Sequence, residues 1–206
     1  TRALDLPGHG RSGGNGKTKI EDYARAVIDF IKQVDMPTPI PCGLSMGGAI
    51  TQQLLLDYQD QFKAGILIST GAKLKVAAAI FEAIENDYNG FVDMVGQLAA
   101  SKKTDPGLVQ FIKDEMIRCK PEITHGDFKA CNRFNTIERL SSIKVPVLVV
   151  SAQDDKLTPP KYADELEKTI KNAARAHIMD AGHVVPLEKP VEVNQAILEF
   201  LDRNGL

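Results

Sequence analysis

Apolar residues run without interruption in five short segments of the chain, each bounded by glycine, proline or polar residues. Strands of a parallel sheet show this pattern because they are buried on both faces. The segments are residues 2–6, a weak one at 40–42, 65–69, 145–151 and 175–179. We predict a strand at each of them.

Between these segments the apolar residues return every three or four positions, which is the spacing of amphipathic helices. The first helix is expected over 20–34, with Thr18 and Glu21 forming a capping box at its start. A second begins at Pro159 or Pro160. The last begins near Pro190 and is expected to bury the apolar residues Val193, Ile197, Leu198 and Leu201. Strands that alternate with helices predict an α/β fold, with a mostly parallel sheet and helices on both of its faces.

The alternation is interrupted once, between residues 71 and 141. No strand is evident there, and the apolar spacing stays helical. We interpret 71–141 as a helical cap inserted into an α/β core made of residues 1–70 and 142–206. We expect most of its larger apolar side chains to be ordinary packing residues, with some of them lining an apolar substrate pocket: Phe81, Ile84, Phe91, Met94, Phe111 and Met116.

Composition narrows the class of partner. The 206 residues are 43% hydrophobic and 25% charged, with a net charge of -2, so no broad positive field would attract nucleic acid or an anionic membrane. No apolar run approaches the roughly 20 residues of a membrane helix. The three scattered cysteines form no disulfide framework and no Cys-x-x-Cys pair, which favours a reducing, cytoplasmic setting. We expect a small-molecule substrate, no cofactor and no metal.

The candidate nucleophile lies in G-L-S-M-G at 43–47. This pattern fits G-x-S-x-G, the nucleophile elbow, in which a serine sits on a strained turn from a strand into a helix. The apolar spacing after Ser45 is helical, as that turn requires. The backbone N–H of Met46, at the helix start, would be one donor to an oxyanion.

A serine hydroxyl needs a general base, and the base needs a carboxylate that holds its tautomer. His183 follows the last predicted strand, and Asp154 and Asp155 follow the run at 145–151, so all lie where strands end. We select Asp155 because it leads into the next helix, although the adjacent Asp154 is an alternative. The order Ser45, Asp155, His183 matches the order expected for the α/β-hydrolase fold. The remaining histidines lie in a glycine-rich turn, in the cap and in a strand: His9, His125 and His177.

These segments resemble the α/β-hydrolase superfamily, in particular capped serine hydrolases of the carboxylesterase or lipase type. L-D-L-P-G-H-G-R-S at 4–12, the elbow at 43–48, the acid loop at 143–159 and the histidine loop at 181–190 carry the likeness. The resemblance implies cleavage of an ester-like substrate through an acyl-enzyme. It also implies a second oxyanion donor from an earlier glycine-bearing loop, which nothing before Thr1 provides. Either the chain is part of a longer protein, or the oxyanion hole is incomplete.

Other interpretations stay open. G-H-G-R-S-G at 8–13 matches the dinucleotide-binding pattern, but the predicted helix starts too late to meet a pyrophosphate. A fold that binds without catalysis is a further alternative. Within the superfamily, carbon-carbon bond hydrolysis and cofactor-free peroxidation are also possible.

Cys42, beside the elbow, is interpreted as a buried apolar residue rather than a nucleophile. Pro37, Pro39 and Pro41 predict a short or irregular strand before the elbow.

Overall fold

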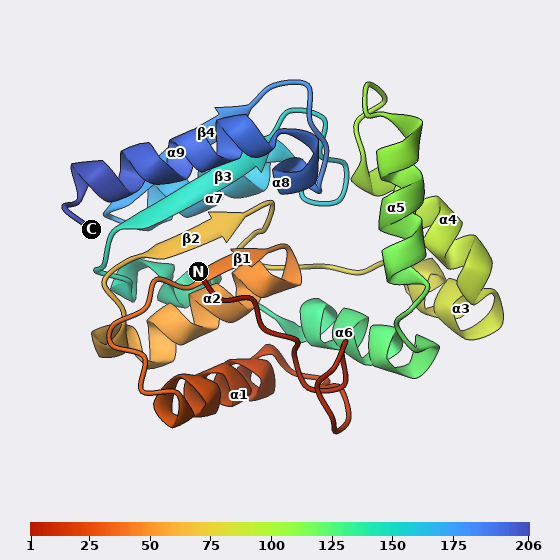
Figure 1. Cartoon of the computed structure of the whole chain (residues 1–206), viewed down its shortest axis with the longest axis horizontal. Coiled ribbons are helices and arrows are strands. Elements are labelled where there is room, and N and C mark those ends of the chain that lie inside the picture. The colour runs from red at the N-terminus through yellow and green to blue at the C-terminus, as the bar shows by residue number, and fades with distance from the viewer.

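The computed structural model describes residues 1–206 as an α/β fold (Figure 1). Four parallel strands form one sheet in the order β1-β2-β3-β4. Their bounds are β1 Cys42–Leu44, β2 Gly65–Ile68, β3 Val147–Ala152 and β4 Ala173–Ile178. The predicted strands at 65–69, 145–151 and 175–179 are therefore confirmed, as is the parallel sheet.

Helices cover both faces of this sheet. The helices of the two layers are α1 Ile20–Gln33, α2 Met46–Asp57 and α7 Pro160–Thr169 on one side, with α8 Val185–Glu188 and α9 Pro190–Arg203 on the other. Neighbouring residues of β2 and β3 point to opposite faces, as strand geometry requires. Leu67 and Val149 join the core under α1, α2 and α7, whereas Ile66 and Val150 join the core under α9. Figure 1 shows α9 and α7 on opposite sides of the sheet.

Helices make up most of residues 71–141, and four α-helices lie between β2 and β3 in the chain. They are α3 Ala78–Asn86, α4 Tyr88–Ala99, α5 Pro106–Met116 and α6 Pro121–Arg133. Short 3-10 turns lie at Gln59–Gln61 and Ile137–Ser142. In Figure 1, α3, α4 and α5 lie to one side of the sheet. Ile84, Phe91, Val92 and Val95 form a small core of their own there. None of the helices is both long and apolar enough to cross a membrane.

The predicted strand at 2–6 does not form. A strand exists only through hydrogen bonds to a neighbour, and residues 2–6 pair with none of the four strands of the sheet. Their polar groups bond within the following turn instead. The Asp5 carbonyl accepts from the Ser12 hydroxyl at 2.7 Å, and the Asp5 carboxylate accepts from the Arg11 N–H at 3.1 Å.

The capping box at the first helix was a wrong prediction. Lys19 is the N-cap of α1, and no side chain caps the helix. Thr18 therefore lies one position too early to accept a hydrogen bond from the first turn.

In the last helix the burial was misassigned in part, because Leu198 is 56% exposed whereas Phe200 is buried.

The strand before the elbow is short, as the prolines predicted. β1 has only three residues, Cys42–Leu44, because Pro41 has no N–H to donate to a ladder. Cys42 was predicted to be buried, but it is exposed at this edge of the sheet.

Candidate active site

The three predicted catalytic residues follow strands that end at one edge of the sheet. Leu44, Ile68 and Val150 are in register across β1, β2 and β3. Ser45 comes directly after β1, Asp155 comes shortly after β3, and His183 lies in the loop after β4. Parallel strands all end at the same edge, and this edge is where α/β sheets bind ligands.

Ser45 has a strained backbone, with φ 54° and ψ −114°. A side chain with positive φ is uncommon, and the strain costs about 1–3 kcal/mol. Two hydrogen bonds hold the turn: the Ser45 N–H donates to the Ile68 carbonyl at 2.9 Å, and the Thr70 hydroxyl donates to the Ser45 carbonyl at 2.9 Å. Ser45 itself is half-buried.

Small residues around Ser45 make this turn possible. A Cβ added at Gly43 would lie 2.0 Å from the Gly47 carbonyl oxygen, and one added at Gly48 would lie 2.6 Å from the Thr70 side chain. A Cβ at Gly47 would touch nothing within 4 Å. Gly43 is therefore required, because the chain folds back against it where α2 starts directly after Ser45.

Met46 is the first residue of α2. The N–H groups of a first helical turn have no acceptor within the helix. The Met46 N–H is thus available to a ligand beside Ser45, and the helix dipole adds partial positive charge at the same point.

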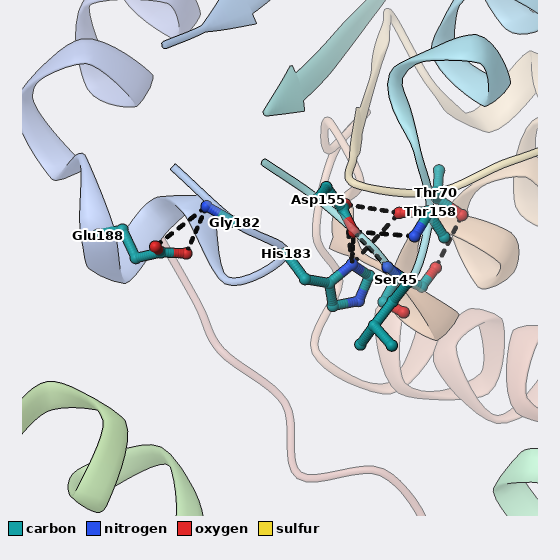
Figure 2. Close-up of polar contacts among 8 residues, drawn as sticks. Ser45, Thr70, Asp155, Thr158, Gly182, His183 and Glu188 are labelled. Carbon is teal, nitrogen blue, oxygen red and sulfur yellow. Dashed lines mark hydrogen bonds and ion pairs between the residues drawn. The ribbon is translucent and has the colours of Figure 1, made fainter. Parts of the chain in front are cut away.

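Asp155 and His183 form a buried pair (Figure 2). The Nδ1 atom of His183 lies 2.9 Å from Oδ2 and 3.1 Å from Oδ1 of Asp155. The side chains of His183 and Asp155 are only 7% and 1% exposed. No hydrogen bond reaches Nε2 of the ring. An Nδ1–H that donates to Asp155 leaves the Nε2 lone pair free, which is the tautomer of a general base.

Three further groups bind the Asp155 carboxylate. The N–H groups of Leu157 and Thr158 donate to Oδ1 at 2.9 and 2.8 Å, and the Thr158 hydroxyl donates to Oδ2 at 2.8 Å. Burial acts to raise the pKa of Asp155, but the bond and charge of His183 and the Thr158 donors outweigh it, so the pKa lies below its ordinary value. The carboxylate is therefore ionised and fixed in orientation.

Asp154, the alternative acid, has a different partner. Its Oδ2 accepts from the Ser101 hydroxyl at 2.5 Å, and no hydrogen bond joins it to His183. Asp154 thus connects the loop after β3 to the segment between α4 and α5.

Glu188 holds the loop that carries His183 (Figure 2). Its carboxylate accepts from the Gly182 N–H at 2.9 and 3.0 Å, from the Ser101 N–H at 2.9 Å and from the Thr104 hydroxyl. Thr158 and Glu188 were not predicted to be parts of this site. Thr158 carried a local signal, since a hydroxyl three residues after an acid often bonds back to it; Glu188 carried none.

No hydrogen bond joins Ser45 to His183 in this structure. Such bonds are often long or poorly aligned before substrate binds. The other histidines lie elsewhere: His177 Nδ1 contacts the Ser151 hydroxyl at 3.0 Å and His125 pairs with Glu85 at 2.9 Å.

The apolar side chains named as possible pocket walls differ in their burial. Phe91 and Ile84 are packed in the small core of that segment, and Met94 and Phe111 are exposed. A cavity of about 350 Å³ does involve Phe81, but its other walls are polar: Glu85, His125, Lys129, Asn132 and Arg133.

Comparison with known proteins gives one consistent result. The family model described as serine aminopeptidase, S33, matches residues 1–189. The chain is 24% identical over 207 residues to 3-oxoadipate enol-lactonase 2 of Acinetobacter baylyi, a match that covers 97% of this chain and 77% of that protein. It is 28% identical over 195 residues to a pimeloyl-[acyl-carrier protein] methyl ester esterase of Neisseria meningitidis, covering 88% and 75%.

Solved structures agree. A thermophilic esterase superimposes with a TM-score of 0.89 at 31% identity, covering 97% of this chain and 79% of the other. The likeness therefore extends over nearly the whole chain.

Proposed function

The chain belongs to the serine aminopeptidase S33 family of α/β-hydrolases, and we propose that it is a serine esterase. In this proposal Ser45 is the nucleophile, His183 is the general base and Asp155 is the carboxylate that orients His183. The buried Asp155–His183 pair, at the sheet edge where Ser45 takes its strained turn, carries this proposal. The esterase and enol-lactonase names of its relatives favour a small carboxylic ester as substrate.

In the first half of the proposed reaction, Ser45 Oγ attacks the ester carbonyl and its proton moves to His183 Nε2. Asp155 stabilises the imidazolium that results. The carbonyl oxygen becomes an oxyanion, to which the Met46 N–H donates. The tetrahedral intermediate then collapses: the bond to the leaving alcohol breaks, and His183 returns the proton to that alcohol.

In the second half, water attacks the acyl-Ser45 carbonyl and gives its proton to His183. Collapse of this second intermediate releases the carboxylic acid, and Ser45 regains its proton. In each half His183 accepts one proton and gives one proton away, so the enzyme returns to its starting state. The protons and bonds of the reaction balance without a cofactor.

The choice of Asp155 over Asp154 is supported by their partners. Asp155 contacts Nδ1 of His183 with both oxygens, whereas Asp154 bonds to Ser101. A carboxylate can orient an imidazole only through a direct hydrogen bond.

We assign residues 71–141 as a cap over a core of 1–70 and 142–206. The separate small core of α3 and α4 supports this division, and so do the bonds of Ser101 to the loops of Asp154 and Glu188. Through these bonds the cap reaches the loops that carry Asp155 and His183, so it is the part of the chain best positioned to select substrates.

An ester panel tests the proposal. Acetyl, butyryl and octanoyl p-nitrophenyl esters are hydrolysed by the wild type, and S45A loses at least about 10³-fold in kcat/KM. Ser69→Ala is the matched control, because Ser69 follows the neighbouring strand and its buried hydroxyl has no partner. S69A retains activity. Equal rates in wild type and S45A would refute the nucleophile, and a wild type inactive on every ester would favour a binding role.

A further inference from the structure

Three side chains with metal-binding atoms meet at a second place, outside the proposed catalytic residues. His9 lies in the turn 7–13, Cys119 lies between α5 and α6, and Asp127 lies on α6. One ligand atom from each lies within 4.8 Å of the other two. The sequence predicted no metal, because these residues come from segments that are far apart in the chain and form no spacing motif.

The ring of His9 is oriented as in a metal ligand. Its Nδ1 lies 3.2 Å from the Pro7 carbonyl oxygen, so Nδ1 carries the hydrogen and Nε2 faces Asp127 Oδ2 at 2.8 Å. Metal-bound histidines commonly donate their other ring N–H to a backbone carbonyl in this way. Oδ2 of Asp127 accepts hydrogen bonds only, so in the metal-free chain Nε2 donates its own hydrogen to it. A metal ion bound here would replace that proton.

The carboxylate of Asp127 is held by a second layer of bonds. Tyr23 donates its hydroxyl to Oδ1 at 2.5 Å, and the Tyr23 oxygen accepts from the Lys17 N–H at 2.8 Å. Oδ1 is thereby occupied, and Oδ2 is left for the ion. Ligating carboxylates are usually fixed by such partners.

The ligand types select the metal. A thiolate, an imidazole and a carboxylate together suit Zn²⁺, whereas Mg²⁺ and Ca²⁺ require oxygen ligands. Tetrahedral zinc places its ligand atoms about 3.3–3.7 Å apart, so shifts of roughly 1 Å would bring these three into place. The side chains of His9 and Asp127 are 24% and 15% exposed, which leaves room for a water molecule as fourth ligand.

We propose that His9, Cys119 and Asp127 form a zinc site that joins the turn 7–13 of the core to the segment carrying α6. Bound zinc would cross-link two parts of the chain that otherwise meet through hydrogen bonds. Because zinc binds the folded chain and not the unfolded one, zinc at concentrations above its dissociation constant raises the midpoint of thermal unfolding. We expect a rise of about 3 °C or more.

Cobalt provides the direct test, because a thiolate bound to Co²⁺ gives a charge-transfer band. The full chain is freed of metal by dialysis against a chelator and titrated with Co²⁺. We expect one equivalent to bind with this band and with the visible absorption of tetrahedral cobalt, and Zn²⁺ to bleach both. C119S loses the band, and D127N and H9Q weaken Zn²⁺ binding at least about 10-fold. C42S is the matched control and retains the band, because Cys42 lies on β1.

The site is overturned by the absence of saturable Co²⁺ or Zn²⁺ binding up to about 100 µM, or by a charge-transfer band that persists in C119S. Circular dichroism of the metal-free variants establishes that each is folded. Should C119S fail to fold, Tyr23→Phe decides, since it removes the bond to Oδ1 and the acceptor of the Lys17 N–H but none of the three proposed ligands. Y23F keeps the band but binds zinc about 10-fold more weakly, and unchanged zinc affinity in Y23F and D127N would also contradict the proposal.

Discussion

His183 Nδ1 lies 2.9 Å from Asp155 Oδ2, in a pair that is almost fully buried. Buried ions are costly unless they are paired and hydrogen-bonded. Here Thr158 and Leu157 supply the remaining donors to the carboxylate. The pair is therefore both paired and hydrogen-bonded, as a buried charge requires.

Asp155→Asn removes the charge and offers His183 an amide. The expected loss in kcat is about 10³–10⁴-fold, because the imidazole is then held in the wrong tautomer and its charged form is not stabilised. Steady-state ester hydrolysis measures it. Asp154→Asn is the matched control and should cost less than about 10-fold, since Asp154 bonds to Ser101. A larger effect at Asp154 than at Asp155 would reverse the assignment.

The lowered pKa of Asp155 makes stability depend on pH. Because the folded pKa lies below the ordinary value of 3.8, the ionised carboxylate stabilises the fold above about pH 4. This contribution is lost as the pH falls through the lowered pKa. Urea unfolding of wild type and D155N should therefore give a difference in the free energy of unfolding that shrinks from pH 6 to pH 3. A difference independent of pH would contradict the pKa direction.

Glu188→Ala leaves the N–H groups of Gly182 and Ser101 without their acceptor. We expect a loss of about 2–3 kcal/mol in the free energy of unfolding, because bonds to a carboxylate are charge-assisted. The rate should also fall about 10-fold, with the loss in kcat rather than KM, since the His183 loop is loosened. Glu192→Ala, at an exposed position of α9, is the control. Equal stability of the two variants would rule out this positioning role.

Gly43→Ala tests the fold of the elbow. The new Cβ would lie 2.0 Å from the Gly47 carbonyl, so the turn must open. We expect a destabilisation of about 3 kcal/mol or more, visible in thermal unfolding. At Gly47 a Cβ meets nothing within 4 Å, and Gly47→Ala should retain most of the stability. Similar melting of both variants would show that the turn relieves the contact at Gly43 with little loss of stability.

Much of the fold was predictable because apolar residues recur differently along the sequence in buried parallel strands and in amphipathic helices. The run at 145–151 and the helix that begins at Pro160 follow directly from those periods. The segment at 2–6 has the same apolar period but forms no strand, because pairing depends on a neighbour and not on the segment itself. Periodicity also placed Leu198 on the wrong side of α9.

The site was partly predictable for a related reason. Ser45, Asp155 and His183 each follow a strand, and strand ends meet at one edge. Glu188 and the cluster around His9 depend on contacts between loops and helices that are far apart in the chain, and no local pattern determines such contacts. For the same reason the sequence does not show which aromatic residues of the cap pack together, as Phe91 does.

The most direct measurement is covalent labelling of the full chain with a fluorophosphonate, followed by mass spectrometry of its peptides. An activated serine attacks phosphorus, and the adduct stays on that residue. The expected result is one adduct on Ser45, absent in S45A, retained in S69A and formed much more slowly in H183A. An unlabelled wild type, or equal labelling of S45A, would contradict Ser45 as the nucleophile.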